Sequence, residues 1–362
     1  MRKVYNFGAG PSMLPESVLL RAQAEMLDWH GTGCSIMEIG HRTQTFQTLI
    51  EKIEVDLRAV MAIPKNYHVL FAAGGATTQT AMIPLNLLAT NNKADYVQTG
   101  RWSQKAFEEA QLYGDIHLAA TEQERNGKLY IPSVETWSIR KDAAYLHYTP
   151  NETIVGLEFQ WVPQIGDVPL VADMTSMILS RPTDVSQFGL IYAGAQKNAG
   201  QAGITLVIIR DDLVRNPHPH TPSLYRYQNM IKEHSVGNTP PTYAWYMAGL
   251  MFEWIKEQGG VDVLYARNLR KAAMLYDVID TTNGFYVNKV EADCRSIMNV
   301  IFHLHDEALT RPFIDEAKQH GLEYLAGHKT YGGIRVSIYN AMPEEGVKLL
   351  ANFMKDFAAR RG

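Results

Sequence analysis

The sequence predicts an α/β protein with a mainly parallel sheet, followed by a smaller α+β unit. Helical and strand-like apolar patterns alternate along most of the chain, several apolar runs have the length of buried strands, and a smaller set of elements follows a glycine pair at 259–260. The 362 residues are 46% hydrophobic, enough for a large core and two domains. We expect a large domain over residues 1–258 and a small one over 259–362, with residues 1–15 as a candidate to pack with the small domain.

The elements of the large domain follow in order. A helix is predicted from apolar residues at helical spacing, namely Phe46, Leu49, Ile50, Ile53, Leu57, Val60 and Met61. Short buried strands are predicted at 68–73, 170–173, 190–193 and 204–209. Near residue 240, Asn238 and Thr239 are predicted at the N-cap of a helix that ends before Gly259.

The small domain shows two strand patterns, at 297–304 and 334–338. A last helix is predicted to start at Pro343 and to carry Val347, Leu350, Phe353 and Phe357 on one face. Glu344 and Glu345 in its first turn suit the positive end of the helix dipole.

Charge and cysteine content exclude several classes of function. Lys and Arg total 34 against 38 for Asp and Glu, a net charge of −4 without a long run of one sign. This balance argues against nucleic acid or an anionic membrane as partner and leaves a small molecule as the default. Only Cys34 and Cys294 are present, in no metal or redox spacing, so we expect no metal site and a reducing compartment. Without a signal-peptide pattern or a membrane-spanning run, the expected location is the cytoplasm.

The pair Lys197 and Asp173 is the first candidate for chemistry. Lys197 follows the apolar run at 188–192 among small residues, and loss of hydration favours its neutral, nucleophilic form. Asp173 ends a predicted strand, at the sheet edge where α/β proteins bind ligands. A lysine that forms a Schiff base and a carboxylate that holds a pyridine nitrogen protonated are what a pyridoxal phosphate enzyme needs. Most lysines and aspartates at strand ends are nevertheless solvated or turn-forming, so the pair alone does not establish a pyridoxal phosphate site.

A phosphate site is predicted where a strand meets a helix at residues 70–79. Gly74 and Gly75 permit close approach of the backbone, and the amides of Ala76, Thr77 and Thr78 lie at a helix start that suits an oxyanion. The segment is neither a Walker loop nor a dinucleotide fingerprint. The alternative is that these glycines only connect the strand to the helix and bind no phosphate.

Seven strings resemble those of the phosphoserine aminotransferases, class-V aminotransferases among the fold-type I pyridoxal phosphate (PLP) enzymes. They are NFGAGPSMLP at 6–15, MEIGHR at 37–42, HYTPNET at 147–153, ADMTS at 172–176, YAGAQKN at 192–198, NTPPTYAW at 238–245 and GGIRVSIYNA at 332–341. They cover the chain in the family's order. The resemblance implies a large domain with a mainly parallel seven-stranded sheet and a smaller C-terminal α+β domain.

The resemblance also implies roles for individual residues. Lys197 would bind the cofactor covalently and move a proton, and Asp173 would pair with the pyridinium nitrogen. Further cofactor contacts would come from Trp102 on the ring, Thr153 on the ring-hydroxyl side, and Ala76, Thr77, Gln196, Asn238 and Thr239 on the phosphate. In this family the last two belong to the neighbouring subunit, which implies a homodimer with its active site at the interface.

Substrate recognition would rest on cationic side chains. The implied reaction transfers an amino group from L-glutamate to 3-phosphooxypyruvate, giving O-phospho-L-serine and 2-oxoglutarate in L-serine biosynthesis. Arg42 and Arg335 match the family's anion-binding arginines, with His41 and His328 beside them. Some bacterial members have arginine at the positions of Thr77 and Lys329, so phosphate recognition here is expected to depend more on Arg42, His328 and Lys329.

Three alternatives stay open. An alanine–glyoxylate type transaminase or a cysteine desulfurase would share the fold, although two small carboxylates need fewer cations and Cys294 lies in no glycine-rich loop. A non-catalytic PLP-binding paralogue would predict a damaged site, whereas the expected residues are all present. Use of the related phosphorylated substrate of pyridoxine biosynthesis is left open by the sequence.

Overall fold

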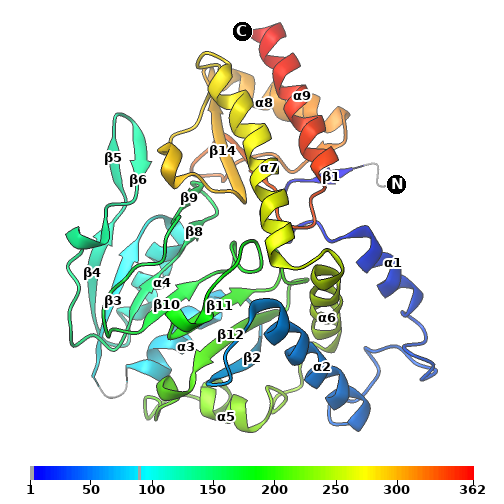
Figure 1. Cartoon of the computed structure of the whole chain (residues 1–362), viewed down its shortest axis with the longest axis vertical. Helices are drawn as coiled ribbons and strands as arrows, with labels where there is room; N and C mark the ends of the chain where they lie inside the picture. Colours follow the sequence, from blue (N-terminus) through cyan, green and yellow to red (C-terminus); the bar gives the residue numbers. More distant parts are fainter. Residues whose placement is uncertain (1–3, 89–90) are drawn as a thin grey trace.

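The computed structural model describes residues 4–88 and 91–362. Its centre is a seven-stranded sheet with the order β2 (Tyr67–Ala73), β12 (Ile204–Arg210), β11 (Leu190–Gly194), β10 (Leu170–Asp173), β7 (Leu146–Tyr148), β3 (Lys93–Gln98) and β4 (Asp115–Thr121). Only β12 runs antiparallel to its neighbours, so the predicted mainly parallel sheet is confirmed (Figure 1). The strand predictions at 68–73, 170–173, 190–193 and 204–209 are confirmed within a residue at each end.

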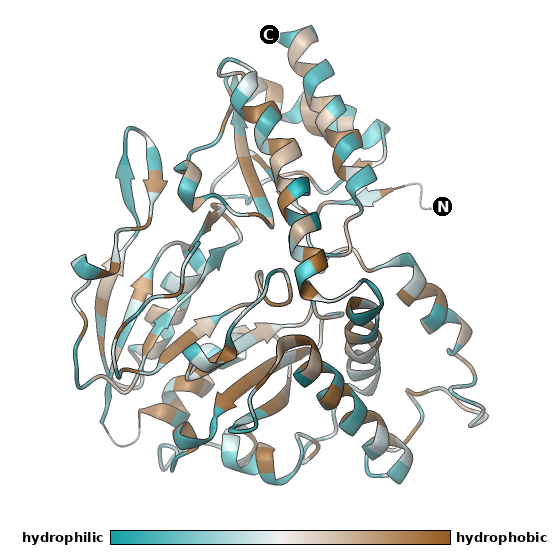
Figure 2. Cartoon of the chain, viewed as in Figure 1, coloured by the Kyte–Doolittle hydropathy of each residue, from teal (hydrophilic) through white to brown (hydrophobic). Residues whose placement is uncertain are grey.

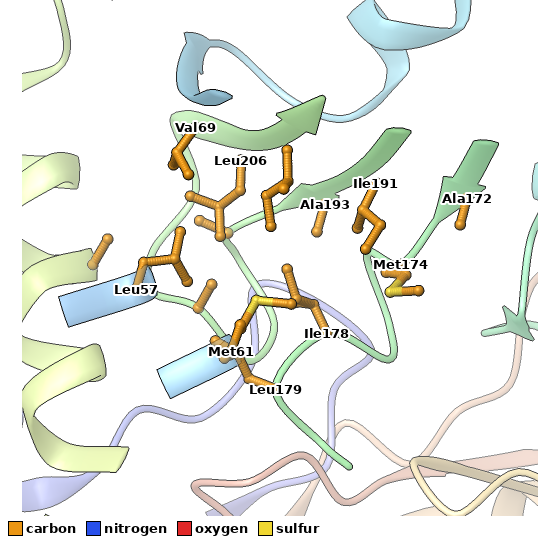
Figure 3. Close-up of a cluster of buried hydrophobic side chains, with 14 of the residues drawn as sticks. Leu57, Met61, Val69, Ala172, Met174, Ile178, Leu179, Ile191, Ala193 and Leu206 are labelled. Carbon is orange, nitrogen blue, oxygen red and sulfur yellow. The ribbon is translucent and has the colours of Figure 1, made fainter. Parts of the chain in front are cut away.

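One face of this sheet packs against α2 (Gln44–Met61) and α6 (Thr242–Glu257). The predicted periodicity of α2 is confirmed, since Phe46, Ile50, Ile53, Leu57 and Met61 are buried. Thr43 caps this helix by accepting from the Phe46 N–H at 3.3 Å, and Ala62 ends it in the left-handed conformation. Figure 3 shows Leu57 and Met61 among side chains from β2, β12, β11 and β10.

The other face of the sheet carries a second apolar layer. Side chains of α3 (Thr77–Leu87), α4 (Arg101–Ala110) and α5 (Tyr227–Lys232) cover the alternate positions of the same strands. Both faces are therefore covered, and the central strands are the apolar runs seen in brown in Figure 2. α1 (Glu16–Ala24) lies beside α6 (Figure 1).

The C-terminal part of the chain forms its own apolar cluster. An antiparallel sheet of β13 (Tyr286–Val287), β14 (Asn299–Leu304) and β16 (Ile334–Ser337) is covered by α7 (Val261–Thr281), α8 (Thr310–Gln319) and α9 (Glu344–Arg361). The N-terminal strand β1 (Tyr5–Asn6) pairs with β15 (Leu322–Glu323), and Phe7 and Met13 lie in the same cluster. The first three residues of the N-terminal segment considered above lie outside the described residues.

Two short hairpins complete the described fold. β5 (Gln123–Arg125) pairs with β6 (Lys128–Tyr130), and β8 (Asn151–Glu152) pairs with β9 (Leu157–Glu158). Among the described residues no helix has both the length and the apolar character needed to cross a membrane. The same residues contain no cluster of metal-ligating side chains.

Candidate active site

A cavity of about 410 Å³ opens where β10 and β11 end and the C-terminal part of the chain meets the main sheet. The carboxyl ends of parallel strands are the edge where open α/β sheets bind ligands. Its lining includes Ala76, Thr77, Trp102, Thr153, Asp173, Gln196, Lys197, His328 and Arg335. Nine of the residues singled out from the sequence thus line one cavity, although they come from segments far apart in the chain.

Lys197 lies at the floor of this cavity. Its side chain is 7% exposed, and Nζ donates a hydrogen bond to Thr153 Oγ1 at 2.7 Å. Burial lowers the pKa of the lysine to about 8, with Arg335 adding to the effect and Asp173 opposing it. A substantial share of the amine is therefore neutral near pH 8, as a nucleophile or general base requires.

The turn that carries Lys197 is held from the N-terminal segment. Ser12 Oγ donates to the Lys197 carbonyl at 2.7 Å, and the Ser12 N–H donates to the Gln196 carbonyl at 2.9 Å. A Cβ on Gly10 would lie 3.5 Å from the lysine side chain, an ordinary contact distance. The Lys197 backbone is thus fixed by a segment 185 residues away in sequence.

Asp173 faces the same cavity from the end of β10. Its Oδ1 accepts from the Thr175 N–H at 2.9 Å and from Thr175 Oγ1 at 2.5 Å, while Thr175 Oγ1 accepts from the Gly194 N–H at 3.2 Å. Burial raises the pKa of this carboxyl, and the bonds from Thr175 and the charge of Lys197 oppose that rise. The Tyr192 hydroxyl also interacts with this carboxyl and opposes the rise in its pKa, so Thr175 and Tyr192 together hold the Asp173 side chain.

A helix start whose amides suit an anion forms one side of the cavity. α3 begins at Thr77 with Ala76 at its N-cap, and the first turn of a helix leaves amide N–H groups without intrahelical acceptors. The strand, glycine turn and helix predicted at 70–79 are confirmed. The Thr78 amide is already used, because it donates to the Gly75 carbonyl at 3.0 Å, so the expectation that it is free was wrong.

Cationic side chains line the upper part of the cavity. Arg335 on β16 is half-buried, its Nε is buried without a hydrogen-bond partner among the described residues, and burial lowers its pKa. His328 and Lys105 line the cavity with it. Among the described lining residues, Asp173 is the only carboxylic acid. The cavity therefore suits a ligand with several negative charges.

Trp102 lines the opposite wall, in the first turn of α4. Its side chain is 37% exposed, so the core does not enclose it. A cavity wall of this kind offers an aromatic face to a flat ligand.

Five of the residues singled out from the sequence do not line this cavity in the described part of the chain. Thr239 and His41 line a separate one of about 490 Å³, Asn238 lines a third of about 310 Å³, and Arg42 and Lys329 are exposed. The predicted capping of α6 by Asn238 and Thr239 was also wrong. The helix starts at Thr242 with Pro241 as N-cap, since two consecutive prolines keep the preceding chain extended.

Sequence reasoning missed several polar residues around the cavity. Glu152 is fully buried behind it, Thr175 holds Asp173, and Asn151 lines the cavity with its Oδ1 buried and unpartnered among the described atoms. All three lie inside strings compared above, within two positions of residues that were singled out. Their position close to a predicted ligand contact is the sequence feature that could have identified them.

This arrangement combines a buried amine of lowered pKa, a half-buried carboxylate, free helix-start amides and an arginine in one cavity. The amine can add to a carbonyl carbon and afterwards exchange protons at that carbon. The helix start can hold an oxyanion, and the guanidinium can bind a carboxylate in bidentate fashion.

Comparison with known proteins gives relatives over the full length of the chain. The family model described as aminotransferase class-V matches residues 4–350. A phosphoserine aminotransferase of Acidithiobacillus ferrooxidans is 52% identical, covering 99% of both chains, and one of Acinetobacter baumannii is 54% identical, covering 99% of this chain and 100% of the relative.

Solved structures agree with the sequence relatives. The phosphoserine aminotransferase of Bacillus circulans subsp. alkalophilus superposes with a TM-score of 0.96 at 46% identity over 99% of both chains. The PLP-bound enzyme of Trichomonas vaginalis superposes with a TM-score of 0.92 at 38% identity, over 97% of this chain and 99% of that one. The predicted fold and family are confirmed: the chain belongs to the class-V aminotransferases.

Proposed function

We propose that the protein is a PLP-dependent phosphoserine aminotransferase, which exchanges an amino group between L-glutamate and 3-phosphooxypyruvate. The products are 2-oxoglutarate and O-phospho-L-serine, so the enzyme serves L-serine biosynthesis. The names of relatives above 50% identity support this activity. The observation that carries it is the buried Lys197 amine in one cavity with Asp173 and a helix start.

The cavity residues fit PLP by their chemistry. Lys197 supplies an amine for the aldehyde, Asp173 a carboxylate for the pyridine nitrogen, and α3 a helix start for the phosphate. A Cβ on Gly75 would meet nothing within 4 Å, so the backbone here is open to a phosphate group. The buried, unpartnered Thr149 Oγ1 and Asn151 Oδ1 are further polar atoms at this cavity.

Each of these residues has its own role in the proposed amino transfer. Bound PLP supplies the electron sink that makes the substrate Cα proton acidic. Lys197 Nζ would hold the cofactor and, once a substrate amine has taken its place, would accept the proton from the substrate Cα and deliver it to C4′ of the cofactor. Asp173 would keep the pyridine nitrogen protonated, and Thr175 fixes the direction of that carboxylate. Trp102 would cover the ring, Thr153 would lie on its hydroxyl side, and Gln196 would contact the phosphate.

Arg335 is assigned to the substrate carboxylate. Its Nε is buried and without a partner among the described groups, so an incoming carboxylate would satisfy it. His328 and Lys105 add donors for the second anionic group, phosphate in one half-reaction and carboxylate in the other. Thr77 contributes through its backbone, which its side-chain identity does not affect.

A homodimer is part of this proposal. Asn238, Thr239, His41 and Arg42 are expected to bind phosphate or substrate, yet in one subunit they lie at other surfaces. His41 and Thr239 line one and the same cavity, so a second copy could present them together at the active site. Exposed Lys329 would likewise act at the cavity entrance. We place the enzyme in the cytoplasm.

The division into residues 1–258 and 259–362 is proposed on the apolar clusters. The C-terminal cluster contains residues from α7 to α9, with Phe7 and Met13 from the N-terminal segment. Ser12 in that segment also bonds to the Lys197 carbonyl, so movement of the small domain would shift the backbone that carries the cofactor-binding lysine.

The structure weakens the desulfurase alternative. Cys294 is buried, burial raises its pKa to about 11, and neither cysteine is among the described residues of the cavity. A thiol of that pKa is protonated at neutral pH and is a poor nucleophile.

Half-reactions with single substrates test the proposed function. Rapid mixing of the PLP-loaded enzyme with phosphoserine, serine, alanine or glutamate would follow the visible absorbance of the cofactor. We expect phosphoserine and glutamate to react with higher kcat/KM than serine and alanine. A preference for serine or alanine would contradict the substrate assignment, and absence of a visible band would contradict the cofactor assignment.

A further inference from the structure

We propose that Glu152 is a positioning residue of the active site, which holds Trp102 against the cavity by capping the helix that carries it. This inference rests on the proposed function, in which Trp102 covers the cofactor ring. Glu152 itself is not among the described residues that line the cavity.

The hydrogen bonds define the cap. α4 begins at Arg101 after Gly100, a residue without a side chain to cap it. Glu152 Oε1 accepts from the Ser103 N–H at 2.8 Å and from Ser103 Oγ at 2.6 Å, while Oε2 accepts from the Trp102 N–H at 3.2 Å. A carboxylate from about 50 residues away in sequence thus does what an N-cap side chain normally does.

The site is shaped around this carboxyl group. A Cβ on Gly100 would lie 2.7 Å from Glu152 Cδ, so only glycine leaves room for it there. Glu152 is 0% exposed, and a carboxylate removed from water is costly unless its oxygens are hydrogen-bonded. Burial raises its pKa to about 7, against the pull of the bonds from Ser103 and Trp102.

Trp102 depends on this cap more than a core residue would. Its indole is 37% exposed and faces the cavity, so packing does not fix it. What fixes it is the backbone of the first turn, where its own N–H and that of the next residue bond to Glu152. Thr153, which accepts the hydrogen bond from the Lys197 amine, directly follows Glu152, so two adjacent residues contact the helix of Trp102 and the lysine.

The test compares Glu152→Gln with Glu158→Gln in the PLP-loaded enzyme. Glu158 is the matched control, because it is a buried carboxyl on the same hairpin that accepts a backbone N–H, that of Ile297 at 2.8 Å, away from α4. Each change is also made in a Trp102→Phe background. The readouts are the visible circular dichroism of the cofactor, the rate of PLP release and urea unfolding.

We expect Glu152→Gln to accelerate PLP release about three- to tenfold and to reduce the visible dichroism, the range that loss of one aromatic contact predicts. In the Trp102→Phe background the same change should add less than about twofold, because coupled residues are not additive. Glu158→Gln should lower stability and leave both cofactor readouts unchanged.

Full additivity with Trp102→Phe, or a Glu152→Gln variant that matches Glu158→Gln, would overturn the inference. Should Glu152→Gln fail to fold, Ser103→Ala removes one donor to the carboxylate and must show the same coupling to Trp102, in a smaller amount. A wild-type enzyme that binds no PLP would instead refute the proposed function.

Discussion

Replacing Lys197 by methionine is expected to stabilise the cofactor-free protein while abolishing its activity. The lysine is buried at the cavity floor, and its pKa falls from 10.5 to about 8. A shift of that size corresponds to about 3 kcal/mol of destabilisation of the folded state when the amine is charged. Methionine fills a similar volume without a charge, so the variant should gain up to about 3 kcal/mol at pH 7.

The sign of the pH dependence follows from proton binding. Below pH 8 Lys197 is protonated in both states, so the wild type carries the full cost. Between pH 8 and 10.5 the unfolded chain binds more protons than the folded one, and wild-type stability rises with pH relative to the variant. Above pH 10.5 the amine is neutral in both states, and this contribution to the difference disappears.

Urea unfolding of both cofactor-free proteins at a series of pH values measures the difference. Lys105→Met, which removes another lysine of the same cavity, controls for the loss of a side chain there. The reasoning is refuted if Lys197→Met is no more stable than wild type at pH 7. It is also refuted if the gap between the two does not narrow from pH 8 to pH 10.5.

Three further predictions concern residues around the same cavity. Thr175→Val should lower the free energy of unfolding by about 2–4 kcal/mol, because Asp173 loses a 2.5 Å bond and the Gly194 N–H loses its acceptor, whereas Thr175→Ser should restore most of it in urea titrations. Gly100→Ala should lower the free energy of unfolding by about 1–3 kcal/mol, because its Cβ would collide with Glu152. Gly75→Ala is the control, since its Cβ would meet nothing within 4 Å, and it should change the free energy of unfolding little. Arg335→Ala should raise KM for glutamate and phosphoserine at least about tenfold while PLP stays bound. Arg311→Ala, on the exposed face of α8, is the control and should leave KM unchanged. Equal KM values for the two variants would speak against Arg335 as the carboxylate site.

The sequence was most informative where one local signal decides the structure. α2 was predictable because seven apolar residues keep helical spacing over the whole segment. β10, β11 and β12 were predictable because strands covered on both faces read as continuous apolar runs. Asp173 could be singled out because it ends such a run, and Lys197 because it follows one after a short stretch of mainly small residues.

Contacts between distant segments could not be predicted in the same way. No local pattern indicates that Ser12 bonds to the Lys197 carbonyl, or that Glu152 caps a helix 50 residues earlier in the chain. The capping predicted for Asn238 and Thr239 failed because the two following prolines delay the helix to Thr242. His41 lines a separate cavity and Arg42 is exposed, and no local pattern in the sequence indicates that they lie apart from Lys197 within one chain.

Lys197 is the lysine proposed to bind the cofactor covalently. Borohydride treatment of the PLP-loaded enzyme, followed by digestion and mass spectrometry, locates the reduced label directly. We expect a single labelled peptide that contains Lys197. A label on Lys105, which lines the same cavity, or a labelled protein after Lys197→Met, would contradict it.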